Sequence, residues 1–319
     1  MLEALNFVKA AVNVNGLSTN HLHVTLGDGF VKSFNGSMAL YSPIDLHIEA
    51  SPKAIPFMKA IASCKDTDTT TMHLTPTGKL AIKSGKFKCF IDSIEDPFKD
   101  IEPEGDKIPL SKDFLEAMMV LSPFMSADSF KPWACSMLLT DNSIMVTNNV
   151  IAIEYWMKKK FPVTVSLPKG TVKTLLSIKD VPTHMSMSAN TATFYYEGGR
   201  WLRTSVNDLD QWPVEQLRTI LNTPCTPTPP LAGFFDGVKT LSPFASDFSG
   251  ITFNEDGMST SNHDNDGASL DFEGLTQSHF HHKHLMLLAP IVDSIALDNW
   301  PKACVFYGKN LRGAIMGMA

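Results

Sequence analysis

Four histidines near the C-terminus have the residue type and the close spacing that metal chemistry would require. They are His279, His281, His282 and His284. A metal hydrolase could combine such imidazoles with nearby acidic residues, and these are Asp264, Asp266 and Asp271. On a strand, alternate side chains point to opposite faces, so the first two histidines would be separated from the last two. We therefore interpret the cluster as a polar strand-to-helix junction and keep a metal-dependent enzyme as the alternative.

The sequence holds none of the common catalytic signatures. It has no Gly-x-Ser-x-Gly turn, no Walker loop, no Gly-x-Gly-x-x-Gly loop and no His-Glu-x-x-His helix. The five cysteines are scattered without a Cys-x-x-Cys pair, which is typical of reduced thiols in a reducing compartment. We predict a protein that is not an enzyme and that uses no cofactor.

Lysine recurs at the start of three predicted helices. Lys53, Lys169 and Lys283 follow one another at intervals of 169 − 53 = 116 and 283 − 169 = 114 residues. A cation near a helix N-terminus is mildly unfavourable because of the helix dipole, so its repetition suggests a use. For any single lysine, a solvated helix face is the alternative. The lysines on this set of helices form our candidate cationic surface: Lys9, Lys53, Lys59, Lys112, Lys169, Lys173, Lys239 and Lys283.

Other landmarks recur at nearly the same interval. Asn35, Asn148 and Asn262 stand at matching places, with steps of 148 − 35 = 113 and 262 − 148 = 114 residues. A glycine-bearing turn also recurs, with steps of 198 − 85 = 113 and 308 − 198 = 110, at Gly85, Gly198 and Gly308. Several landmarks in the same order indicate three copies of one unit.

Each copy has the pattern of a helix, several strands, a second helix and more strands. In the second copy, Phe114 and Met118 follow the N-cap candidate Ser111 at helical spacing. Its strands are expected at about 135–140, 143–147, 150–157, 161–167, 184–188, 191–197 and 200–206, with the second helix near 168. Pro56 and Pro290 lie inside the second helices of the other copies, so we expect those helices to start late or to kink.

Two Pro-containing connectors separate the copies. They open at Asp96-Pro97-Phe98 and at Gln211-Trp212-Pro213. The sequence therefore predicts an α+β protein of three repeated domains, at residues 1–106, 107–220 and 221–319.

The composition is that of a soluble globular protein, with 44% hydrophobic and 19% charged residues. No apolar run is long enough to cross a bilayer, and the N-terminus lacks the basic region of a signal peptide. We therefore expect a cytoplasmic protein without membrane contact. The net charge of −6 disfavours nucleic-acid binding over the whole surface, but it permits one basic face.

The layout resembles the beta-type DNA polymerase sliding clamp of bacteria, in a shortened form such as phages carry. The segment from Ser143 to Ala152 is similar to the family's Ala-Thr-Asp-Gly-His-Arg-Leu-Ala strand, turn and strand. The ending Met316-Gly317-Met318 resembles its Met-Pro-Met, and Trp212-Pro213 stands where the family has Phe-Pro. The resemblance covers the whole chain and implies the DNA-clamp fold, with two helices and two antiparallel sheets in each domain.

This resemblance implies a head-to-tail ring of two chains around double-stranded DNA, in the cytoplasm of the bacterium or of a phage's bacterial host. The cationic surface would face the DNA without reading its sequence. Peptides of the polymerase and the clamp loader would dock in a groove between the second and third domains. By matching positions that groove would contain Thr147, Asn149, Val150, Ala152, Ala314, Met316 and Met318.

One further alternative keeps the fold but not the role. A clamp-like interaction protein, or decoy, could bind replication factors without encircling DNA. Such a protein would keep the groove and lose the cationic surface, so the recurring lysines favour the clamp.

Overall fold

The described residues of the computed structural model divide into two compact units. The description covers residues 1–13, 18–65, 68–95, 98, 101–127, 130–161, 163–210, 212–246, 248, 250–260 and 266–318. One unit joins Met1–Lys112 with Lys173–Val206, and the other joins Asp113–Val172 with Asn207–Ala319. Within the described ranges, no helix is long and apolar enough to span a membrane.

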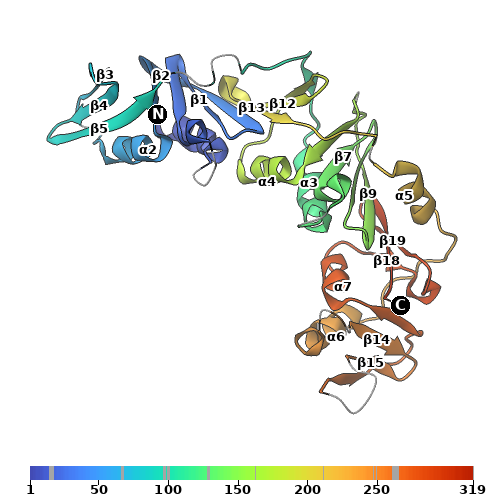
Figure 1. Ribbon diagram of the computed structural model, residues 1–319. Coiled ribbons are helices and arrows are strands. Elements are labelled where there is room, and N and C mark those ends of the chain that lie inside the picture. The colour runs from blue at the N-terminus through green and yellow to red at the C-terminus, as the bar shows by residue number, and fades with distance from the viewer. Residues whose placement is uncertain are drawn as a thin grey trace. The chain divides into compact units, whose positions relative to one another are not determined.

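The first unit is built on a nine-stranded antiparallel sheet (Figure 1). Its strands are β1 (Val24–Phe34), β2 (Met38–Pro52), β3 (Thr70–Leu74), β4 (Lys79–Ser84), β5 (Phe87–Ile94), β6 (Ile108–Pro109), β11 (His184–Met187), β12 (Thr191–Tyr195) and β13 (Trp201–Ser205). The order is β3-β4-β5-β2-β13-β12-β11-β6, with β1 paired to β2. Helices α1 (Leu2–Val8) and α2 (Ala54–Ser63) pack on each other and against these strands.

The second unit contains a seven-stranded and a four-stranded sheet. The larger has the order β10-β7-β8-β9-β20-β19-β18 and the smaller β16-β15-β14-β17. The strands are β7 (Ser136–Leu139), β8 (Ser143–Thr147), β9 (Ile151–Trp156), β10 (Val165–Pro168), β14 (Ile251–Asn254), β15 (Gly257–Ser259), β16 (Ser269–Asp271), β17 (Ser278–Phe280), β18 (Ser294–Ile295), β19 (Cys304–Gly308) and β20 (Leu311–Ile315). The helices are α3 (Phe114–Leu121), α5 (Val214–Leu221), α6 (Phe234–Leu241) and α7 (His282–Leu288), and α4 (Lys169–Ser177) begins in this unit.

The larger sheets each combine two of the repeats found in the sequence. Strand β2 of the first repeat pairs with β13 of the second, through contacts such as Leu40 with Leu202. Strand β9 of the second repeat pairs with β20 of the third, where Ala152 lies opposite Ala314. The second repeat therefore contributes strands to both sheets. The boundaries 1–106, 107–220 and 221–319 stay a prediction, whereas the α+β fold of helices and antiparallel sheets is confirmed.

The predicted landmarks have a local structural cause. Asn35 Oδ1 accepts hydrogen bonds from the N–H groups of Ser37 (3.1 Å) and Met38 (2.8 Å), which closes the turn between β1 and β2. Asn148 Oδ1 does the same for Val150 (3.0 Å) and Ile151 (2.8 Å) between β8 and β9. Such side-chain turns explain why asparagine recurs there. Asn262 lies outside the described residues.

Two expectations about the proline positions were wrong. Pro56 is the third residue of α2, where a helix N–H has no intrahelical acceptor, so the helix begins directly after Lys53. The second helix of the third repeat was expected to continue past Pro290, but α7 ends at Leu288 because a proline cannot continue the hydrogen-bond pattern. In addition, α3 begins at Phe114, three residues after the expected cap at Ser111.

One helix, α5, was not predicted from the sequence. The stretch after Trp212 was interpreted only as a connector, yet it contains α5, which packs on β9 and β20. The signal was present, because Val214, Leu217 and Leu221 repeat at helical spacing on one face. The prolines that follow it led to the misinterpretation.

Candidate functional site

Six of the seven predicted groove residues meet at one end of three central strands of the seven-stranded sheet. Thr147 at the end of β8 lies opposite Ala152 on β9, and Ala152 lies opposite Ala314 on β20. Beyond the ladder, the N–H of Met316 donates to the carbonyl oxygen of Val150 at 2.9 Å. For these six residues, Thr147, Asn149, Val150, Ala152, Ala314 and Met316, we keep the name of the predicted site and call them the partner groove.

The turn between β8 and β9 is fixed by hydrogen bonds to its own polar side chains. Asn149 has a φ of 75°, a left-handed conformation that asparagine tolerates better than most residues. Its N–H donates to Thr147 Oγ1 at 3.1 Å. The Asn149 side chain is consequently exposed to solvent while the neighbouring strands remain paired.

Helix α5 packs over β9 and β20 beside the partner groove, whose buried residues we call its floor. Leu217, Leu221 and Trp212 pack in one apolar cluster with Ala152 and Ala314. The three residues of the floor are almost fully buried, at 2% exposure for Thr147, 6% for Ala152 and 2% for Ala314. Only the rim is accessible, and Met316 is 39% exposed there. A ligand would therefore reach the rim between the turn and the C-terminal segment first.

Met318, the seventh predicted groove residue, makes its backbone hydrogen bonds to residues outside this set. Its N–H donates to the carbonyl oxygen of His279 on β17 at 2.8 Å. Its own carbonyl oxygen accepts a hydrogen bond from Trp300 Nε1 at 3.1 Å. The C-terminal segment thus leaves β20 and continues alongside the four-stranded sheet.

A buried ion pair joins β9 and β20 next to the partner groove. Glu154 Oε2 accepts a hydrogen bond from Arg312 Nε (2.8 Å) and lies 2.7 Å from Arg312 Nη2, while Oε1 accepts a hydrogen bond from the Ser143 hydroxyl (2.8 Å). Arg312 Nη1 also donates to Asn222 Oδ1 at 2.8 Å, directly after α5. The Arg312 guanidinium group thereby links β20 to β9 and to the C-terminal end of α5.

The histidine cluster forms the junction between β17 and α7, as predicted, but it is not uniformly solvated. His281 Nδ1 accepts a hydrogen bond from the N–H of Lys283 at 3.2 Å and so caps the helix. The ring of His281 stacks on that of His282, with centroids 4.8 Å apart, and His282 is buried. Burial, assisted by His281 and His282, lowers the pKa of His284 to about 4.

The metal-enzyme alternative gains no support from this geometry. Among the described residues, no three histidine, cysteine or carboxylate side chains are grouped so that they could hold a metal ion. Asp264 lies outside the described residues, while Asp271 is the last residue of β16 and Asp266 lies three residues before that strand.

The predicted lysines differ in what they contact. Lys169 Nζ donates to the carbonyl oxygens of Met125 (2.8 Å) and Ser126 (2.9 Å), so it secures the segment after α3. Lys53 Nζ lies 3.3 Å from Asp92 Oδ2. The other six side chains are exposed on or beside the helices: Lys9, Lys59, Lys112, Lys173, Lys239 and Lys283.

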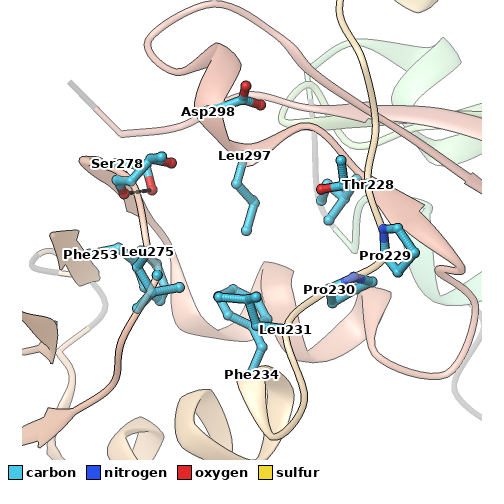
Figure 2. Close-up of a pocket in the computed structure, with 13 residues that line it drawn as sticks. Thr228, Pro229, Pro230, Leu231, Phe234, Phe253, Leu275, Ser278, Leu297 and Asp298 are labelled. Atoms are coloured by element: carbon cyan, nitrogen blue, oxygen red, sulfur yellow. Dashed lines mark hydrogen bonds between the residues drawn. The ribbon is translucent and has the colours of Figure 1, made fainter. Parts of the chain in front are cut away.

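A separate hollow of about 230 Å³ lies in the third repeat (Figure 2). Apolar side chains such as Pro230, Phe234 and Leu297 surround it, and Asp298 lies at its margin. It contains no residue of the partner groove and no predicted lysine, so sequence reasoning did not indicate it.

The fold is that of bacterial sliding clamps. The DNA polymerase III subunit beta of Pseudomonas aeruginosa has a TM-score of 0.83 at 12% identity, over 99% of this chain and 97% of that chain. The Caulobacter crescentus beta sliding clamp gives 0.83 at 12%, over 100% and 96%. The Helicobacter pylori beta clamp, solved with a DNA ligase peptide, gives 0.78 at 17%, over 100% and 97%. No family model and no curated protein matches the sequence.

Proposed function

We propose that this chain is a DNA sliding clamp that encircles duplex DNA and tethers a replicative polymerase, as a cytoplasmic processivity factor. The observation that carries the proposal is the full-length likeness to bacterial sliding clamps together with the sheets shared between repeats. Three repeats would supply half of a six-domain ring, so two chains would close it head to tail.

Two strand edges of opposite charge support this assembly. On β5, residues 87–91 pair only with β4, and among the described residues β16 pairs only with β15. The β5 edge carries the exposed basic residues Lys86, in the turn before the strand, and Lys88. The β16 edge carries exposed acidic residues: Asp266, Asp271 and Glu273. Edge-to-edge pairing would join these strands across chains, and Phe90, 66% exposed on β5, would become buried.

Paired charge reversals test the ring. Chains with Lys86→Glu and Lys88→Glu, or with Asp271→Lys and Glu273→Lys, should each be monomeric by light scattering at micromolar concentration. An equimolar mixture of the two should regain the dimer mass, because both head-to-tail contacts then join opposite charges. A wild-type chain that stays monomeric, or a mixture of the two variants that does not regain the dimer mass, would exclude this assembly.

The DNA role is assigned to the exposed lysines of the helices. Phosphate contacts need no sequence readout and weaken with salt, so binding to duplex DNA should fall steeply as salt rises. The triple variant Lys59→Glu, Lys173→Glu, Lys239→Glu should shorten processive synthesis on a primed template with loader and polymerase, while the dimer persists. The control changes three exposed lysines of the loop after β9 to glutamate: Lys158, Lys159 and Lys160. Equal product lengths for the two triple variants would show that the helix lysines do not contribute to DNA binding.

Peptides of the polymerase and the clamp loader would bind at the partner groove. The likeness to a clamp solved with a DNA ligase peptide supports this assignment. Changing Met316 to a charged residue should weaken binding of a polymerase-derived peptide, because burial of one methionine side chain contributes about 1.5–3 kcal/mol. The decoy alternative predicts intact peptide binding without any effect of the helix lysines on synthesis.

A further inference from the structure

Three separate parts of the second unit hold the segment that follows β20. The N–H of Met316 donates to the carbonyl oxygen of Val150, in the turn between β8 and β9, at 2.9 Å. Two residues later, the N–H of Met318 donates to the carbonyl oxygen of His279 on β17 at 2.8 Å. Trp300 Nε1 donates to the carbonyl oxygen of Met318 at 3.1 Å. Residues 316–318, which we call the C-terminal segment, are therefore attached at both ends.

Gly317 joins the two attached residues and lies against the indole of Trp300. A Cβ at this position would lie 2.5 Å from Trp300 Nε1 and 2.8 Å from the carbonyl oxygen of His279, and it would also collide with Trp300 Cδ1. Only glycine lets the backbone approach the indole this closely. Glycine is also the most flexible residue, so the position of the segment depends on the contacts around it.

Trp300 is itself held in a closed turn. It follows the 3₁₀ helix η7 (Leu297–Asn299), and its N–H donates to the carbonyl oxygen of Leu297 at 3.3 Å. On its other side, the N–H of Lys302 donates to the carbonyl oxygen of Asn299 at 3.0 Å. The Asn299 side chain donates to the carbonyl oxygen of Ala303 at 2.6 Å, directly before β19. The backbone that carries the indole is therefore fixed by its own hydrogen bonds.

The C-terminal segment carries the accessible rim of the partner groove. Met316 is 39% exposed there, between its own bond to Val150 and the two bonds of Met318. A rim residue that is held before binding loses less conformational freedom when a ligand binds. Trp300 is not one of the partner-groove residues, so it can act on the groove only through this segment.

We propose that Trp300 is a positioning residue for the partner groove, whose indole holds the C-terminal segment so that Met316 lies at the rim before a peptide binds. The proposal rests on the peptide docking proposed for that groove. Gly317 serves the same purpose, because a larger residue would push the segment away from the indole. Loss of the indole N–H releases the segment and weakens peptide binding, while the paired strands stay intact.

The first test measures the segment without any ligand. Trp300→Phe keeps an aromatic ring but removes the donor, so the Met318 amide should exchange its hydrogen about fivefold faster. The Met316 methyl NMR signal, assigned with a Met316→Leu chain, should shift, while the denaturation midpoint stays unchanged. The control is Trp156→Phe on β9, where the ring contacts Arg312, and it should alter neither signal. Unchanged Met318 exchange in Trp300→Phe would overturn the proposal.

The second test measures binding. The probe is acetyl-Ala-Leu-Ala-Leu-Ala-amide, because Leu217 and Leu221 make the surroundings of the groove apolar. Its affinity should be about two- to tenfold weaker for Trp300→Phe than for wild type. Gly317→Ala should weaken binding in the wild-type chain and add little in a Trp300→Ala chain, which has no indole to collide with. Equal affinities for wild type and Trp300→Phe, or additive losses in the double variant, would contradict the positioning role.

The two measurements separate this proposal from the proposed function. Normal probe binding together with unchanged exchange in Trp300→Phe refutes the positioning role alone. A wild-type chain that binds neither this probe nor a polymerase-derived peptide refutes docking at the partner groove. In that case the exchange of the Met318 amide still decides whether Trp300 holds the segment.

Discussion

Removing Arg312 should cost far more stability than removing an exposed arginine. Glu154 is buried, and its carboxylate accepts a hydrogen bond from Arg312 Nε, with Arg312 Nη2 only 2.7 Å away, and another from the Ser143 hydroxyl. Arg312→Leu would leave that charge with only the Ser143 hydroxyl, and breaking a buried pair costs about 3–5 kcal/mol. The exposed pair Arg218 and Glu215, 3.4 Å apart, provides the control, because Arg218→Ala should cost about 0.2–1 kcal/mol.

The double variant separates the charge effect from general disruption. Glu154→Leu with Arg312→Leu removes the unpaired charge, so it should recover most of the loss seen in Arg312→Leu. The assay is native-state hydrogen exchange of the β9 and β20 amides, which reports opening of this sheet without assuming that the whole chain unfolds at once. A single-variant cost below about 1 kcal/mol, or a double variant as unstable as the summed singles, would refute the reasoning.

Three further perturbations have defined outcomes. Burial lowers the pKa of His284 from 6.5 to about 4, so between these pH values the unfolded chain binds a proton that the folded chain does not. The free energy of unfolding should therefore fall as the pH drops from 6.5 to 4, and it should fall less steeply with pH in the His284→Gln variant. Burial raises the pKa of the Cys304 thiol to about 12, so a thiol reagent should modify it only on unfolding, and rapid modification of the native chain would contradict this. Gly313→Ala should destabilise β20 by about 1–3 kcal/mol, because its Cβ would collide with the Phe306 ring; an unchanged denaturation midpoint would show that the ring can move.

The sequence predicted those parts of the fold that depend on neighbouring residues. The turns at Asn35 and Asn148 follow from hydrogen bonds between neighbouring residues, so their pattern is visible in the sequence. The pairing of Leu40 with Leu202 is different, because it joins residues far apart in sequence and depends on packing between repeats.

The candidate site, like the fold, could be predicted only where it depends on local sequence patterns or on the family resemblance. Six partner-groove residues meet because a local turn and the end of one strand place them there, and the resemblance to a known family indicated both. The carbonyl contacts of Lys169 and the paired roles of Glu154 and Arg312 could not be predicted, since each depends on a partner from another segment.

The shared sheets mean that the repeat is not the piece into which this chain can safely be cut. The second repeat lends strands to two sheets, so a fragment of residues 107–220 would lose β2 from one side and β20 from the other. Each loss bares a row of backbone donors and acceptors, which is the template for unwanted strand addition. Ala152, almost fully buried in the whole chain, would also lose the strand that lies opposite it. Such fragments should therefore self-associate, and any dissection or domain exchange has to carry the neighbouring strand with it.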